Sequence, residues 1–391
     1  CIRDRVWIYS IVLKLNDGIG TPIANGTMLL ALFQCIFVTG AGACLYKTVR
    51  HFADQKIAWI AYGFYFILGG LSAWIMIPYS DSIGIIFPVF LFWLYVKLKE
   101  TESAKKKCVL LFLMFFLCYI GFEIKPMAAI VMIAVAAVEG IHFIGKLLKK
   151  QIVWKKSVLA CCLSAVLGIG AAAGGVSAVV DSLHFPVVTD TVLGWQHHMM
   201  LGLNKDTNGG YSQADFDYST SFSSAEEQHA AELKEIGKRL KDFGVGGYLQ
   251  HFVKKSARNY FDGCFGWGGL GETFYTEIFP ERGTVLCSLI RSLYYDNTED
   301  TLYRYQALFR QILWYMVLVL VPFSVFTKRP LDKKRQVAVL SVLGLMLYLQ
   351  IFEAHARYLY TFVPIFVFLA TEGIDNLREY LNQKSERRVK K

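Results

Sequence analysis

Apolar runs long enough to cross a membrane dominate this sequence of 391 residues. Nine such runs are separated by polar connections, and they lie at 27–46, 57–77, 82–97, 108–122, 126–145, 157–180, 308–327, 336–352 and 358–374. A bilayer core about 30 Å thick needs about 20 apolar residues per helix, or fewer where Lys or Arg ends the span. Charged residues make up 18% of the chain, whereas soluble proteins average about 25%. The pattern predicts an all-α polytopic membrane protein with about nine transmembrane helices.

Lysine and arginine residues concentrate in every second connection between these runs. The basic connections lie at 47–56, 97–107, 146–156 and 328–335, and a basic tail follows the last run. The positive-inside rule makes all five cytoplasmic, so the net charge of +10 needs no nucleic-acid partner. The intervening connections are then extracytoplasmic. We expect a multi-pass protein of the plasma membrane with its C-terminus in the cytoplasm.

This topology divides the chain into five parts. Because the chain begins in a polar stretch at Cys1, we expect residues 1–26 to be the extracytoplasmic remnant of a first loop, preceded by at least one further span. The other parts are a six-span region at 27–180, an extracytoplasmic helical insertion at 181–306, a three-span region at 307–375 and a basic cytoplasmic tail at 376–391. The insertion holds 17 acidic and 11 basic residues, which agrees with a location outside the cytoplasm.

The insertion carries the helix signals of a folded domain. Ser224 and Glu227 form a capping box that predicts a helix start, and Gly244 predicts the end of that helix. A second helix is expected over 247–261, with Leu249, Phe252 and Val253 on its apolar side. A glycine-aromatic loop follows at 265–271.

Most cysteines lie inside the apolar runs, where free cysteine behaves as a small hydrophobic residue. Only Cys264 and Cys287 lie in the long polar segment in a way that would allow a disulfide. Two free thiols are the alternative.

Ionisable and polar residues gather at the span ends that the topology places outside. Charges at membrane depth are costly and tend to pair or to line a polar cavity. We therefore expect a polar pocket at the outer leaflet. The candidates are Asp81 before the third run, Lys125 between the fourth and fifth, His197, His198, Asn204 and Tyr211 beyond the sixth, and Glu353, His355, Arg357 and Tyr358 before the ninth.

Two of these candidates are cations that suit an anionic ligand. Lys125 precedes Pro126, so its backbone is biased to an extended conformation at a helix start, where phosphate binds well. Arg357 is the second cation. The alternative for both is a snorkelling anchor at the membrane surface. Asp81 has an alternative as well, as the N-terminal cap of its span.

The remaining candidates have both functional and structural interpretations. His197 and His198 are adjacent and point to different faces, so a shared metal is disfavoured, whereas hydrogen bonding or acid–base work by one of them is expected. Glu353 and His355 either orient Arg357 and bind sugar hydroxyls, or serve only as polar loop residues. The need for a divalent cation stays open.

Three stretches resemble membrane glycosyltransferases of the GT-C fold, in the Gram-positive branch related to protein O-mannosyltransferases and aminoarabinose transferases. These stretches are Ile124-Lys125-Pro126, the segment from Met199 to Asn204 with Gly209-Gly210-Tyr211, and the segment from Glu353 to Tyr360 leading into Val363-Pro364. The resemblance extends from the first apolar run to the last.

The resemblance implies an inverting transferase that moves a sugar from a polyprenyl-phosphate carrier to a cell-envelope glycan, lipid-linked or protein acceptor. In such enzymes an acidic residue in the first extracytoplasmic loop is the base, and cations bind the departing phosphate. Lys125 and Arg357 match those cations. Asp4 and Asp17 match no pattern of the family, so we expect the main base upstream of Cys1. Asp81 is the fallback catalytic residue, as a second carboxylate near a metal or the acceptor.

The resemblance also implies catalytic and substrate-binding residues in or near the three stretches. His197 is a further catalytic candidate. Substrate binding is expected of His198, Asn204, Tyr211, Glu353, His355 and Tyr358.

Two other functions are compatible with the sequence. A polysaccharide polymerase or ligase would also act outside, but with a lipid-diphosphate donor. A lipid or polysaccharide transporter would show midplane charges and broken helices, whereas the apolar runs here carry few charges.

Overall fold

The computed structural model describes residues 7–14, 23–150, 156–183, 193–269, 283–295, 302–326 and 331–389, which are helical with no strand in those ranges. The chain forms two compact units. The first unit comprises His184–Gln311 and Leu345–Tyr360, and the second comprises Trp7–Leu183, Ile312–Gly344 and Thr361–Lys391.

The prediction of an all-α polytopic membrane protein is confirmed. Within the described residues, seven helical segments are long and apolar enough to cross a membrane. They are formed by α2 (Ile23–Phe52), α4 with α5 (Ser80–Gly84, Ile86–Glu100), α6 (Ala104–Ile124), η3 with α7 (Pro126–Ala129, Ile130–Leu148), α8 (Lys156–Leu183), α14 with η4 (Leu302–Leu320, Val321–Ser324) and α15 (Lys333–Ile351).

The two other predicted spans have a different structure. The run at 57–77 divides into α3 (Gln55–Tyr65), a π-helical turn η1 (Phe66–Gly70) and a 3-10 turn η2 (Ala73–Met76). The run at 358–374 becomes a short helix α16 (Arg357–Tyr360) and a long helix α17 (Val363–Val389), which continues into the basic tail. Neither is a continuous apolar helix of span length.

Side chains compensate for the break in the 57–77 run. Backbone carbonyls that lose their helical partners need other donors away from water. The Gln34 amide donates to the Ile75 carbonyl at 2.8 Å, and the Ser82 hydroxyl donates to the Trp74 carbonyl at 2.8 Å. The Tyr9 hydroxyl, from the helical residues 7–14, lies 3.0 Å from Gln34 Oε1 and 2.9 Å from the Tyr79 carbonyl oxygen, and its one proton is available to either acceptor. Two backbone carbonyls of the broken segment are therefore bound by side chains inside the second unit.

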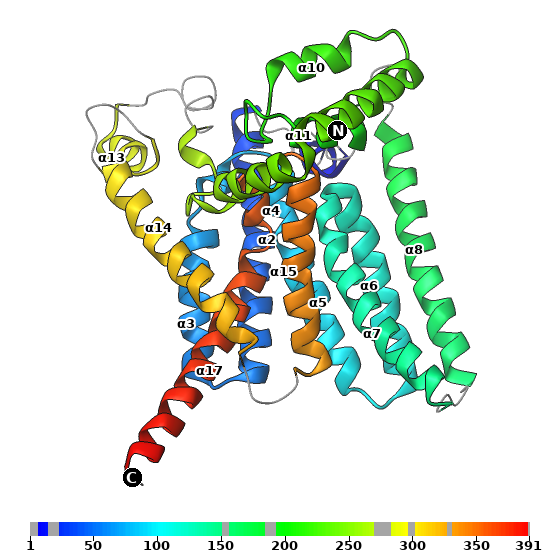
Figure 1. The fold of residues 1–391 in the computed structure, drawn as a ribbon, viewed down its shortest axis with the longest axis vertical. Helices are drawn as coiled ribbons and strands as arrows, with labels where there is room; N and C mark the ends of the chain where they lie inside the picture. The colour runs from blue at the N-terminus through cyan, green and yellow to red at the C-terminus, as the bar shows by residue number, and fades with distance from the viewer. Residues whose placement is uncertain are drawn as a thin grey trace. The chain divides into compact units, whose positions relative to one another are not determined.

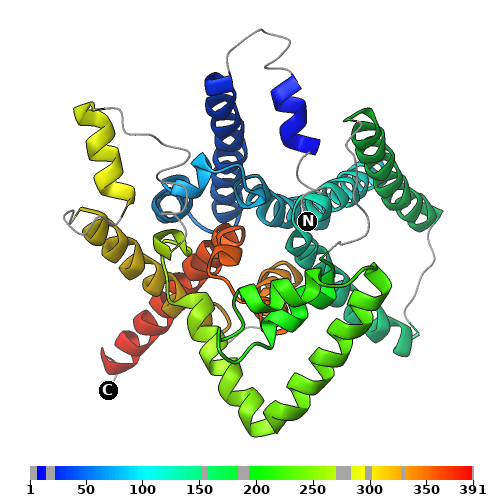
Figure 2. The same ribbon diagram turned by 90° about the horizontal axis from the view of Figure 1, so that it is seen from above.

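In the first unit, the helix α11 (Ala225–Tyr260) contains a sharp bend at Gly244. Gly244 has φ +56° and ψ −177°, a conformation that is essentially restricted to glycine. Figure 2 shows the two arms of α11 diverging from the bend. The Ser224 hydroxyl accepts the Glu227 amide at 3.3 Å. The predicted start of the first helix and its end at Gly244 are thus confirmed.

The predicted apolar side of the second arm is not the buried side. Leu249, Phe252 and Val253 are exposed in the structure. The buried stripe consists instead of His251, Lys255 and Asn259, which are spaced by four residues and therefore share one helix face. His251 and Lys255 on this face contact the backbone carbonyls of Gly202 and Gln350, whereas the Asn259 amide has no hydrogen-bond partner among the described residues. The other helices of this unit are α9 (Trp195–Gly202), α10 (Gln213–Thr220) and α13 (Val285–Tyr294).

In the second unit, α6 packs between α5 and α8 (Figure 1). The contact with α8 depends on Gly168. A Cβ atom added there would lie 2.4 Å from the backbone carbonyl oxygen of Phe112, a distance that no side-chain adjustment relieves. Gly170, on the same helix, has open space at the corresponding point.

We expect Gly168→Ala to force α6 and α8 apart and to lower the thermal midpoint of the detergent-solubilised protein, since overpacking costs about 1–3 kcal/mol. Gly170→Ala is the matched control and should leave the midpoint unchanged or raise it slightly. Equal midpoints for the two variants would contradict the close α6–α8 contact.

Candidate functional site

In the first unit, four of the predicted site residues come together around one carboxylate. Glu353 lies in the irregular segment between α15 and α16 and is largely buried. Its Oε2 accepts the Tyr358 hydroxyl at 2.9 Å and lies 3.5 Å from His198 Nδ1. The His355 ring is 5.9 Å from the Tyr358 ring, measured between centroids. We call these residues, His198, Glu353, His355 and Tyr358, the Glu353 cluster.

The carboxylate of this cluster is held in its charged form. Burial alone would raise the pKa of Glu353, but hydrogen bonds from His198 and Tyr358 lower it below the usual value for glutamate. Glu353 is therefore an anion and a hydrogen-bond acceptor at neutral pH.

Glycines allow the backbone of the Glu353 segment to approach α9 and the turn that follows it. The Ala354 amide donates to the Gly209 carbonyl at 2.7 Å. A Cβ at Gly202 would lie 2.7 Å from the carbonyl oxygens of Ile351 and Phe352. Gly209 has φ +79° and a Cβ there would meet the Gly202 carbonyl. These close approaches explain why the matched segment around Asn204 is rich in glycine.

The glycine-aromatic loop contacts the same cluster. Gly266 has φ +78°, and a Cβ on it would lie 2.7 Å from His355 Cε1. The Phe265 and Tyr360 rings pack with centroids 5.8 Å apart. The last two residues of the predicted loop, 270 and 271, lie outside the described residues. Cys264 and Cys287 are both free thiols.

His197 belongs to a different set of contacts from its neighbour. Its Nδ1 lies 2.7 Å from the Ser219 hydroxyl and 3.9 Å from Glu232 Oε1, and the side chain is buried. Burial lowers the pKa of His197, which favours the neutral imidazole. The two histidines thus face different partners. Within the described ranges no group of three or more His, Cys, Asp or Glu side chains has the arrangement of a metal site.

Asn204 and Tyr211 lie outside the Glu353 cluster. The Asn204 amide donates to Asp215 at 2.9 Å, and its Oδ1 accepts the backbone amides of Asp206 and Thr207. Arg239 binds both oxygens of Asp215, at 2.7 and 2.9 Å. Asn204 therefore stabilises a turn and a buried ion pair. Tyr211 is exposed, with its hydroxyl bound to Gln213.

In the second unit, Asp81 and Lys125 form a buried ion pair. The exposed fractions are 1% for Asp81 and 7% for Lys125. Asp81 is the second residue of α4, whose N-cap is Tyr79, so the structure contradicts the interpretation of Asp81 as a cap. Lys125 is extended at φ −153° and ψ 106°, as expected before Pro126, and its burial contradicts the snorkelling interpretation.

Two buried serine hydroxyls of the second unit lack partners in the described part of the chain. The Ser72 and Ser80 hydroxyls are buried and have no hydrogen-bond partner among the described residues. Gly84 approaches the aliphatic stem of Lys125, since a Cβ at that glycine would lie 3.6 Å from Lys125 Cβ and Cδ. Buried hydroxyls without partners cost free energy, so a polar ligand or water beside them would be stabilised.

Arg357 is the first residue of α16, in the first unit. Its guanidinium carbon lies 5.9 Å from the centroid of the Tyr358 ring. The side chain is half-buried next to the Glu353 cluster. His355 Nδ1 accepts the Arg357 backbone amide at 3.1 Å, which agrees with an orienting role for His355, and the phosphate role of Arg357 stays a prediction.

Lys255 is a site residue that the sequence analysis missed. Its ammonium group is fully buried and donates to the carbonyls of Gly202 and Gln350, at 2.9 and 2.8 Å. Next to it, His251 Nε2 lies 2.9 Å from the same Gly202 carbonyl. Lys255 thus ties α11 to α9 and to the residues just before Glu353. The four-residue spacing of His251, Lys255 and Asn259 could have indicated a buried polar face. The opposite face of the helix is more apolar, so the sequence analysis selected that face instead.

Burial lowers the pKa of Lys255 to about 7, and the Glu353 charge opposes this shift. In the unfolded chain the lysine keeps its proton up to about 10.5. Between these two values the unfolded state binds more protons, so the contribution of Lys255 to stability is expected to increase with pH. Below about pH 7 both states are protonated and the contribution is constant.

We therefore expect the thermal midpoint of the wild type minus that of Lys255→Met to increase as the pH is raised from 7 to 10. Lys254→Met, at the exposed neighbouring position, is the control and should keep the wild-type pH dependence. A Lys255→Met variant with the same pH dependence as the wild type would show that Lys255 is not buried in this way.

Comparisons with known proteins are consistent with this description of a membrane protein. A search of curated proteins finds no match. The model of a family described as conserved hypothetical integral membrane proteins matches residues 23–376, from the first residue of α2 into α17. Because this match covers most of the chain, the protein belongs to that family of conserved integral membrane proteins.

Proposed function

We propose that the protein transfers a sugar from a polyprenyl-phosphate carrier to a hydroxyl group on a cell-envelope glycan, a lipid-linked acceptor or a protein. The observation that supports this most is the buried pair of Asp81 and Lys125 at the ends of membrane spans. Removing two charges from water costs several kcal/mol per ion, and ionisable residues in membrane segments usually mark a functional site. A carboxylate beside an ammonium group is also the pair of charges that this reaction uses.

We assign one step of the reaction to each member of the pair, and the buried pairing with Lys125 leads us to give Asp81, the fallback residue of the sequence analysis, the role of base. The Asp81 carboxylate accepts the proton of the acceptor hydroxyl while the hydroxyl oxygen bonds to the anomeric carbon. The bond from that carbon to the phosphate oxygen breaks, and its electron pair leaves with the polyprenyl phosphate. Protonation of Asp81 removes the charge that faces Lys125, so the ammonium group is released to compensate the charge gained by the phosphate.

The Glu353 cluster provides the groups that sugar recognition needs. A carboxylate, two imidazoles and a phenol hydroxyl offer acceptors and donors for hydroxyl groups. We propose that His198, Glu353, His355 and Tyr358 bind sugar hydroxyl groups, and that Arg357, next to them in the first unit, binds an anionic group. The basic connections support an assignment of these residues to the extracytoplasmic face, with the C-terminus in the cytoplasm.

Asp81→Asn and Lys125→Met are expected to lower sugar transfer by about 10²- to 10⁴-fold, the usual contribution of general acid–base catalysis. Transfer would be measured with the full-length protein in membranes, using a radiolabelled polyprenyl-phosphate sugar. The exposed residues Glu102 and Lys56 provide matched controls as Glu102→Gln and Lys56→Met. Normal turnover in both pair variants, at equal expression, would contradict the proposed roles.

Tyr358→Phe removes the hydroxyl that donates to Glu353, and we expect it to raise the KM for the acceptor or donor more than it lowers kcat. Tyr305→Phe, at an exposed position of the same unit, serves as the control. An unchanged KM in Tyr358→Phe would contradict the proposal that the Glu353 cluster binds substrate.

The break at α3, η1 and η2 favours a second candidate function, transport of a lipid-linked sugar, because transporters bind substrates at discontinuous helices. A donor comparison separates the candidates. Transfer from a monophosphate carrier supports the proposal, and transfer only from a diphosphate carrier indicates a polymerase or ligase. Movement of labelled lipid across vesicles without any transfer indicates a transporter.

A further inference from the structure

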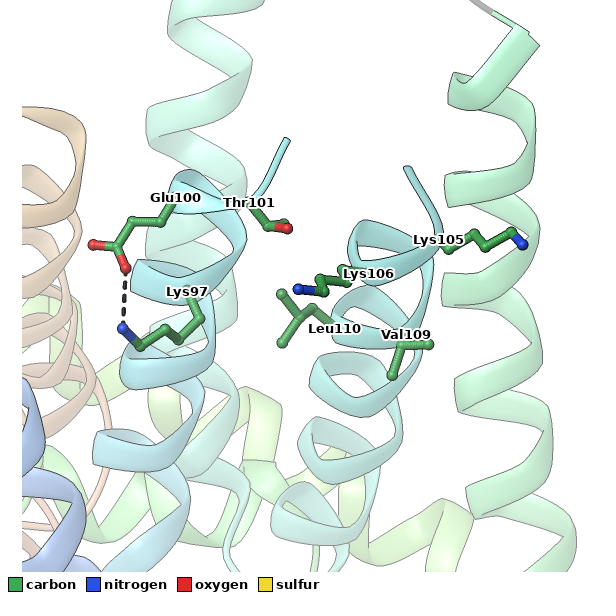
Figure 3. A pocket seen from close by; sticks show the side chains of 7 residues that line it. All are labelled: Lys97, Glu100, Thr101, Lys105, Lys106, Val109 and Leu110. Atoms are coloured by element: carbon green, nitrogen blue, oxygen red, sulfur yellow. Dashed lines mark hydrogen bonds and ion pairs between the residues drawn. The ribbon is translucent and has the colours of Figure 1, made fainter. Parts of the chain in front are cut away.

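A pocket of about 600 Å³ lies between the end of α5 and the start of α6, in the second unit (Figure 3). Its lining combines lysines with apolar side chains: Lys97, Glu100, Thr101, Lys105, Lys106, Val109 and Leu110. The volume is within the range of small-ligand sites, about 300–1,000 Å³. The predicted roles of the protein make no use of this pocket.

The pocket has an uncompensated positive charge. Three lysines line it, and Glu100 is the only acid among its lining residues. Glu100 is already paired with two cations, Lys97 at 3.0 Å and Lys334 at 3.2 Å, and His51 Nε2 lies 2.6 Å from it. The ammonium groups of Lys105 and Lys106 have no ion-pair partner in the described part of the chain, and no acid stands in the first turn of α6.

The lysines of the pocket lie next to apolar side chains of the α6 span. Val109 and Leu110 begin the apolar part of the α6 span, and Val109 is exposed. In Figure 3, Lys106 and Leu110 extend from α6 toward α5, whereas Lys105 points to the other side of α6. A ligand that matches this surface carries a negative charge at one end and a hydrocarbon chain at the other. Basic pockets between transmembrane helices bind anionic lipid headgroups in this way.

We propose that this pocket is a binding site for an anionic phospholipid, with the headgroup phosphate at Lys97 and Lys106 and an acyl chain along Val109 and Leu110. Lys105 contributes to the local positive potential. The site is distinct from the Asp81–Lys125 pair. Lys106 and Lys125 stand near opposite ends of α6, which is about 30 Å long at about 1.5 Å per residue. The proposal therefore does not depend on the proposed sugar transfer.

The test is native mass spectrometry of the full-length protein after delipidation in mild detergent and titration with phosphatidylglycerol or phosphatidylcholine. We expect phosphatidylglycerol to bind in preference to phosphatidylcholine. Each lysine near a charged headgroup is worth on the order of fivefold in affinity, so Lys105→Gln with Lys106→Gln should weaken phosphatidylglycerol binding by about tenfold or more. Lys146→Gln with Lys149→Gln, on basic residues at the end of α7 outside the pocket, is the matched control.

Other outcomes would overturn the proposal. Equal binding of the two lipids, or equal phosphatidylglycerol binding by the pocket variant and the control, would show that the pocket does not select an anionic lipid. Full displacement of phosphatidylglycerol by millimolar glycerol phosphate would show a site for the free phosphate. If the double variant does not fold, the wild-type preference between the two lipids and binding by Lys106→Gln alone decide the question.

Discussion

Pairing of opposite charges is the constraint on which both ends of the second unit depend, and at one end the pair is buried. The Asp81–Lys125 pair occupies the end of α6 that leads into η3. Elsewhere in this unit, Glu139 on α7 accepts hydrogen bonds from Tyr95 on α5, at 2.7 Å, and from Lys333 on α15, also at 2.7 Å. Removing one partner of the buried Asp81–Lys125 pair leaves an uncompensated buried charge, which is strongly destabilising. Each pair therefore orients the spans that carry it.

The same principle shapes the first unit, although there a lysine is paired with backbone carbonyls. Lys255 binds the carbonyls of Gly202 and Gln350, and Glu353 lies three residues beyond Gln350. The glycines at 202 and 209 permit the backbone contact that places Ala354 against Gly209. Buried polar residues on α11 thus position the segment that carries Glu353 and Tyr358, which are hydrogen-bonded to each other. We interpret Lys255 as a positioning residue for that segment.

Hydropathy and local signals predicted the fold class, the break at Gly244 and the cap at Ser224, because each depends on residues close together in the chain. The run at 57–77 looked like a span because its composition is apolar. The break is stabilised by Ser82, 8 residues from Trp74, and by Gln34, 41 residues from Ile75, and the second of these contacts has no local signal. Asp81 and Lys125 were each singled out, but their pairing across 44 residues has no local signal. Asn204 was expected to bind substrate, whereas its hydrogen bonds serve a turn and Asp215.

The most direct measurement is native mass spectrometry of the full-length protein with polyprenyl monophosphate, comparing the wild type with Lys125→Met. We expect the wild type to retain a polyprenyl monophosphate or its glycosylated form, and the variant to lose it. Retention of a polyprenyl-diphosphate oligosaccharide, or of no polyprenyl lipid even after it is added back, would contradict a sugar transferase that uses a monophosphate carrier.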